Sequence, residues 1–147
     1  MTEQAPGLLL LDTHVWIWLF EGDTSRVGSD VAAVVDRAAA EWNVRVSTMS
    51  VWEVAMLAAR RRVTLSFDCD AWVRNALDRP GVRLESFTPK IAIESTRLPN
   101  FAHRDPADRI LIATARVTSA TLVTRDRRIL DYAAKGYLRV LDATPRV

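Results

Sequence analysis

The chain has 147 residues and a net charge of +2, with 49% hydrophobic and 26% charged residues, a balance typical of one soluble globular domain. No apolar run approaches the roughly 20 residues that a bilayer span requires, and the first residues lack the basic stretch of a secretory signal, so we expect a cytoplasmic protein. A single cysteine excludes a disulfide within the chain, and two histidines do not favour a Cys/His zinc site.

Short apolar runs alternate with helical patterns from one end of the chain to the other. Residues 1–7 are expected to form a flexible tail. In chain order, we then predict a strand at 8–11, a helix at 13–20, a helix at 29–42, a strand at 44–47, a helix at 51–61, a helix at 69–79, a strand at 82–87, a helix at 89–97, a helix from about 106 to 117, a strand at 120–124, a helix at 126–135 and a strand at 138–142. This alternation predicts a single three-layer α/β/α domain around a parallel sheet.

Acidic residues recur near the carboxyl ends of the predicted strands. Asp12 follows the first strand directly, and Asp126 follows the "TLVT" strand by two residues. Glu53 is expected in the first turn of the helix after "VRVS", and Asp105 and Asp108 lie at the start of another helix. Ligands of open α/β sheets bind outside the carboxyl ends of the strands, so a suitable strand order would gather these acids.

Each acid also has a structural explanation. Ser50 and Glu53 fit a capping box, in which the serine caps the helix and the glutamate bonds back to it. Asp105 precedes a proline and fits a helix cap, and Asp12 and Asp126 are each suited to start a helix. Considered one at a time, the acids favour this capping interpretation over catalysis.

Considered together, the acids favour a cation site. Several carboxylates within a few ångströms repel one another, so their pKa values rise or a cation enters. Oxygen ligands without histidine or cysteine suit a hard ion such as Mg²⁺ or Mn²⁺. The sequence does not show whether the acids converge.

Four motifs in order resemble those of the PIN-domain ribonucleases, and more narrowly those of the VapC toxins of bacterial toxin–antitoxin pairs. They are "LLLLDTHVWIWL", "SVWEVA", "HRDPADRILIATA" and "LVTRD", and the resemblance covers about Leu8 to Leu141. It implies a PIN domain over residues 8–147. A lone "DTH" would be unspecific, whereas four ordered motifs with the expected strand and helix context are specific.

The resemblance implies roles for individual residues. Asp12, Glu53, Asp108 and Asp126 correspond to the acidic quartet that is catalytic and binds Mg²⁺ or Mn²⁺. Asp108 is preferred to Asp105 because "DRILIATA" matches the family's acid followed by an apolar helix. The supporting positions are Thr13, which follows the first acid, Thr124, where the family often has a small hydroxyl residue, and Asp105, an additional acid of the "HRDP" subgroup.

The implied activity is hydrolysis of RNA phosphodiester bonds by a water molecule, with no side-chain nucleophile. Relatives of this type usually form homodimers and are silenced by a VapB-like antitoxin, so we expect both here, and no membrane association. Single-stranded RNA loops are the expected targets because their bases are accessible.

Eighteen of the 20 cationic residues are arginine, a side chain suited to phosphate. Genome base composition explains this bias equally well. Two clusters are candidates for RNA binding, namely Arg60, Arg61 and Arg62, and Arg125 with Arg128. Solvated helix ends remain an alternative explanation for both clusters.

The chain departs from its relatives at Arg62-Val63-Thr64-Leu65, where many have a Gly-Lys-Leu turn, and at Ala107, where phenylalanine is frequent. Neither departure touches the quartet.

Other function classes fit less well. A receiver domain needs a lysine near the last strand, and Lys135 is poorly placed. A haloacid-dehalogenase-like phosphatase needs Asp-x-Asp after the first strand, and a dinucleotide-binding domain needs a glycine-rich turn. A PIN fold that binds RNA or a partner without cleavage remains an open alternative.

Overall fold

The structure is a computed structural model that describes residues 7–146. The predicted tail therefore lies outside the described residues, apart from Gly7. The elements are β1 (Leu9–Leu11), α1 (Thr13–Glu21), α2 (Ser29–Ala40), β2 (Val44–Ser47), α3 (Thr48–Ala59), α4 (Cys69–Leu77), β3 (Val82–Glu85), α5 (Pro89–Ser95), α6 (Pro106–Thr118), β4 (Thr121–Thr124), α7 (Arg127–Ala134) and β5 (Val140–Asp142).

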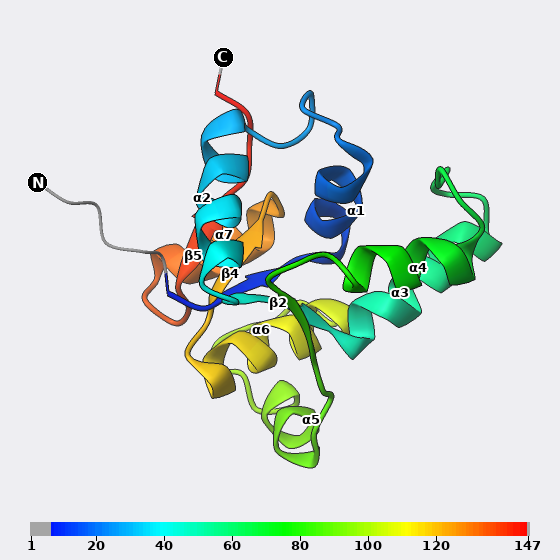
Figure 1. Cartoon of the computed structure of the whole chain (residues 1–147). Helices are drawn as coiled ribbons and strands as arrows, with labels where there is room; N and C mark the ends of the chain where they lie inside the picture. The colour runs from blue at the N-terminus through cyan, green and yellow to red at the C-terminus, as the bar shows by residue number, and fades with distance from the viewer. Residues whose placement is uncertain (1–6, 147) are drawn as a thin grey trace, which may run out of the picture.

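The five strands form one parallel sheet in the order β3-β2-β1-β4-β5 (Figure 1). β1 is central, with Leu9 opposite Val44 of β2 and Thr121 of β4. The chain adds β2 and β3 on one side of β1 and then crosses to add β4 and β5 on the other. The strand order therefore reverses between β1 and β4, the position at which α/β sheets form a ligand crevice.

Helices cover both faces of the sheet, which confirms the predicted three-layer architecture. Leu9 and Leu11 pack with buried residues of α1, α2, α3 and α4. Leu10 and Leu122 point to the other face, where they pack with α5, α6 and α7. Successive strand side chains point to opposite faces, so a strand buried on both sides is apolar throughout, as β1 is.

The predicted element boundaries are least accurate at α3. This helix begins at Thr48, three residues earlier than predicted, because the hydroxyl of Ser47 caps it by accepting a hydrogen bond from the Met49 N–H at 3.0 Å. The predicted Ser50 capping box is therefore wrong. Glu53 lies in the second turn of α3 rather than in the first.

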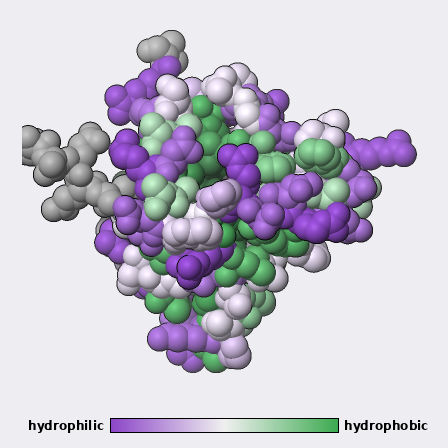
Figure 2. Space-filling model, in the orientation of Figure 1, coloured by the Kyte–Doolittle hydropathy of each residue, from purple (hydrophilic) through white to green (hydrophobic). Residues whose placement is uncertain are grey.

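A cavity of about 420 Å³ opens among α1, α2 and α4, lined largely by apolar side chains that include Trp16, Phe20 and Val35. Figure 2 shows hydrophobic residues in the recess between α1 and α2, with hydrophilic residues around them. Across residues 7–146, no helix combines the length and the apolar character that crossing a bilayer would require.

Candidate active site

The four acids of the predicted quartet lie beyond the carboxyl ends of β1, β2 and β4 or at the start of a helix. Asp12 follows β1 and caps α1, and Asp126 caps α7 just after β4. Glu53 comes from α3, which follows β2 directly, and Asp108 lies in the first turn of α6. The capping roles predicted for Asp12 and Asp126 are thus correct, and they coexist with a position at the sheet crevice.

The charges of these acids act on one another. Burial, together with the charges of Asp105, Asp12 and Asp126, raises the pKa of Asp108 from 3.8 to about 7, even though a hydrogen bond with His103 opposes the rise. Acids that are far apart in the sequence therefore lie close enough to interact. The structure brings together the carboxylates whose convergence the sequence left open.

Asp12 and Glu53 lie at the buried side of the site. Burial raises the pKa of Asp12, an effect that hydrogen bonds from Thr124 and Thr13 oppose. Burial also raises the pKa of Glu53, and the charges of Asp12 and Asp105 add to the rise. Within residues 7–146, neither Asp12 nor Glu53 has an ion-pair partner. Two half-buried carboxyl groups without a cation form a site that a positive ion would stabilise.

Thr124 joins two acids of the site. Its buried hydroxyl donates to Oδ2 of Asp12 at 2.6 Å and accepts from the backbone N–H of Asp126 at 3.0 Å. The other oxygen of Asp12 accepts from the Thr13 N–H at 2.7 Å. Both oxygens of Asp12 are therefore held in place.

Thr13 and Ser50 hold Glu53. The hydroxyl of Thr13 lies 2.6 Å from Oε1 of Glu53 and 2.8 Å from Oγ of Ser50. A hydroxyl has a single proton, so Thr13 donates to the carboxylate and accepts from Ser50. Ser50 and Thr13 are both almost fully buried. This role of Ser50 was not predicted from the sequence. The available signal was its position three residues before Glu53 on one helix face.

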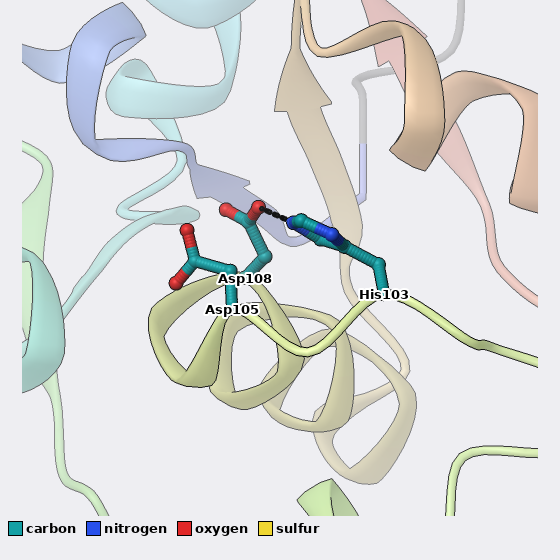
Figure 3. Close-up of side chains that lie close together, drawn as sticks. All are labelled: His103, Asp105 and Asp108. Atoms are coloured by element: carbon teal, nitrogen blue, oxygen red, sulfur yellow. Dashed lines mark hydrogen bonds and ion pairs between the residues drawn. The ribbon is translucent and has the colours of Figure 1, made fainter.

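His103 is a second residue that sequence analysis did not assign to the site. Its Nε2 lies 3.0 Å from Oδ2 of Asp108 (Figure 3). Asp105 caps α6 by accepting from the Ala107 N–H at 3.0 Å, as predicted, and extends from the same helix turn as Asp108. The signal for His103 was its place in the "HRDP" motif itself.

Potential metal ligands are most closely spaced at one side of the crevice. In residues 7–146, His103, Asp105 and Asp108 are the one set of three such residues whose candidate ligand atoms all lie within 4.8 Å of one another. Among residues 7–146, no set of three that includes Asp12, Glu53 or Asp126 is this compact, so their oxygens are spaced more widely. Mg²⁺ usually keeps several water molecules, so carboxylates at this wider spacing can bind it through water. The oxygen-rich donor set fits a hard divalent ion.

The two arginine clusters lie in different places. Arg128 belongs to the site, because its backbone N–H donates to Oδ1 of Asp126 at 2.8 Å. Arg125 has its guanidinium 5.3 Å from the ring centre of Trp18. Arg60, Arg61 and Arg62 follow the C-terminal end of α3 (Figure 1), whereas Glu53 lies about 10 Å earlier along that helix.

Comparisons with known proteins agree with this geometry. The sequence matches the family described as "PIN domain" over residues 9–135. It is 31% identical over 121 residues to ribonuclease VapC22 of Mycobacterium tuberculosis, a match that covers 82% of this chain and 88% of the relative. The fold resembles DNA-bound VapBC from Salmonella typhimurium, with a TM-score of 0.68, 13% identity and coverage of 92% of this chain and 98% of the other. It also resembles the sarcin–ricin loop cleaving toxin VapC20 of Mycobacterium tuberculosis, with a TM-score of 0.55, 19% identity and coverage of 90% and 98%.

Proposed function

The chain belongs to the PIN-domain family, as its motifs predicted, and we propose that it is a divalent-metal-dependent endoribonuclease that acts as the toxin of a toxin–antitoxin pair. Residues 8–147 act as one catalytic domain in this proposal, because the five strands form a single sheet. The relative VapC22 is a ribonuclease, which supports a nuclease activity on RNA.

The main support is the convergence of carboxylates from separate elements at the reversal point of the sheet. Their mutual repulsion and burial raise the pKa of Asp108 to about 7, and a cation would relieve both effects. In this proposal Asp12, Glu53, Asp108 and Asp126 hold Mg²⁺ or Mn²⁺, and Asp105 adds negative charge. When bound, such an ion neutralises phosphate charge and lowers the pKa of water.

The protein residues contribute orientation and proton transfer. Thr124 and Thr13 fix Asp12, and Thr13 with Ser50 fixes Glu53, so neither carboxylate has to be ordered when RNA binds. One carboxylate, Glu53 or Asp126, orients the attacking water and accepts its proton. No side-chain nucleophile is required, because water attacks phosphorus and the ester oxygen leaves.

The proposed partners follow from the relatives. The similar structure from Salmonella is a VapBC complex, so we propose a VapB-like antitoxin as the partner that silences the chain. A homodimer and a cytoplasmic location complete the proposal. We propose that arginines of both clusters bind RNA phosphates, with Arg125 and Arg128 closer to the acids than Arg60, Arg61 and Arg62.

The test is cleavage of RNA by the purified chain with Mg²⁺, with Mn²⁺ and with a chelator. We expect cleavage only with metal, and a loss of about 1,000-fold in Asp12→Asn and Asp108→Asn. Asp131→Asn, which changes an exposed acid of α7, is the matched control and should cleave like the wild type.

Two results would count against the proposal. Cleavage that survives both substitutions would show that a different site or a contaminant is responsible. Metal-induced stabilisation together with RNA binding, but without cleavage of any RNA tested, would favour the alternative of a PIN-fold binding protein.

A further inference from the structure

Arg128 and His103 form a bridge between two acids of the site. The Arg128 guanidinium places one terminal nitrogen 3.1 Å from Nδ1 of His103, and His103 Nε2 lies 3.0 Å from Oδ2 of Asp108. At its other end, Arg128 is joined to Asp126 by its backbone N–H. The bridge therefore spans from the start of α7 to the start of α6.

The donors of this bridge can be assigned. A guanidinium has only N–H donors, so Nδ1 of His103 must accept. A neutral imidazole that accepts at Nδ1 has its proton on Nε2, which then donates to Asp108. Both imidazole nitrogens are thus used, and the histidine ring connects the arginine to the acid in one orientation.

The neighbouring arginines are held elsewhere. Arg125 donates to the backbone carbonyl of Arg26 at 2.9 Å and lies over Trp18. The charges of Arg127 and Arg125 both act on Asp142, the last residue of β5. Of the three arginines between residues 125 and 128, Arg128 is the one that the structure connects to the acids.

Among residues 7–146, most N–H groups of the Arg128 guanidinium have no hydrogen-bond acceptor. Its Nε lies 3.7 Å from Oδ1 of Asp126, which is an ion-pair distance but too long for a good hydrogen bond. Within residues 7–146, His103 is the only group hydrogen-bonded to the guanidinium of Arg128, whose side chain is 59% exposed. Four N–H groups beside a cluster of negative charge remain for an anion from solution.

We propose that His103 is a positioning residue that fixes the Arg128 guanidinium at the rim of the acidic site, where it binds a phosphate of the RNA substrate. The inference rests on the proposed ribonuclease function. The acids repel the RNA backbone, and a cation held at a fixed position offsets this repulsion. Fixing the side chain in advance also avoids the entropy of ordering an arginine when RNA binds.

The test measures binding of a short single-stranded RNA in the Asp12→Asn background with Mg²⁺, by fluorescence anisotropy at several salt concentrations. Arg128→Ala should weaken binding about tenfold at low salt and reduce the salt slope by about 0.7, the value for one phosphate contact on a single strand. Arg127→Ala loses the same charge one residue away and serves as the matched control, with an unchanged slope.

The role of His103 is tested with a double-mutant cycle. His103→Ala should weaken binding several-fold and reduce the salt slope, and the double variant should be no weaker than Arg128→Ala alone. His103→Gln should restore much of the affinity, because an amide oxygen can accept from Arg128 while the amide nitrogen donates to Asp108. Thermal unfolding of each variant checks that the fold is intact.

Three results would overturn the inference. They are an unchanged salt slope in Arg128→Ala, additive losses in the double variant, and an effect of Arg127→Ala as large as that of Arg128→Ala. If instead the unmodified chain neither binds nor cleaves RNA, the proposed function fails, and this inference fails with it.

Discussion

The start of α6 and its middle differ in what they contribute to the molecule. Asp105 caps the helix and Asp108 lies in its first turn, where the charges of Asp105, Asp12 and Asp126 repel that of Asp108. Its middle contains Leu111, Ile112 and Ala113, all completely buried in the core beneath the sheet. One helix therefore combines a stretch that stabilises the fold with a stretch whose charges weaken it. The difference is consistent with the proposed cation site, in which the start of the helix contributes to binding rather than to stability.

The largest effect on stability is expected in the buried middle of the helix. Ile112→Ala removes packed atoms from a fully buried position and should lower the free energy of unfolding by about 2–5 kcal/mol. Urea denaturation followed by circular dichroism measures this. Ile93→Ala on α5, which is half exposed, is the control and should change stability by less than about 1 kcal/mol. An equal loss in both variants would mean that the core is not where the structure places it.

A substitution in the first turn of α6 is expected to raise the stability of the fold rather than lower it. The pKa of Asp108 is raised from 3.8 to about 7 in the folded chain, so its protonated form is favoured by folding. The protonated carboxyl group of Asp108 therefore stabilises the folded chain fully below about pH 4, and this stabilisation is lost as the pH rises through about 7. In metal-free buffer, Tm should fall between about pH 5.5 and pH 8, and Asp108→Asn should melt about 3 °C or more above the wild type at pH 8.

Added Mg²⁺ sharpens this comparison. It should raise the Tm of the wild type at about pH 8 and leave that of Asp108→Asn nearly unchanged, because binding stabilises only a chain with an intact site. Differential scanning calorimetry measures both changes. If Asp108→Asn melts below the wild type at about pH 8, Asp108 stabilises the fold rather than destabilising it.

A smaller effect is expected for Ser50, which reaches the site only through Thr13. Ser50→Ala removes the hydroxyl that donates to Thr13 and should lower kcat for RNA cleavage about tenfold, with KM nearly constant. Ser66→Ala, on the exposed loop after α3, is the control. A change in KM alone would place Ser50 in substrate binding instead of in the orientation of Glu53.

Much of the fold was predictable because its signals are local. Short apolar runs such as "LLLL" indicate strands buried on both faces, and β1 is such a strand. The strand order is not local, and the parallel pairing of β1 with β4 joins residues more than 100 positions apart. The start of α3 was mispredicted because Ser47 and Ser50 both precede an apolar run, and only the end of β2 decides which of them caps the helix.

The motifs predicted candidate acids that the structure places near one another, but they did not predict the side chains that hold these acids in position. Asp12 and Asp126 follow strands, so their position at the crevice follows from the fold class. The hydrogen bonds of Thr13 with Ser50, and of His103 with Arg128, join side chains 37 and 25 residues apart. Such contacts depend on how the helices pack against one another, and helix packing cannot be predicted from composition or periodicity.

The position of β4 beside β1 has a consequence for synthesis of the chain. Asp12 receives its hydrogen bond from Thr124, which is translated 112 residues later. While a ribosome is still making the middle of the protein, the nascent chain lacks both that hydroxyl and Asp126. A nuclease with this topology therefore has its complete set of acids only after almost the whole domain has been synthesised and folded.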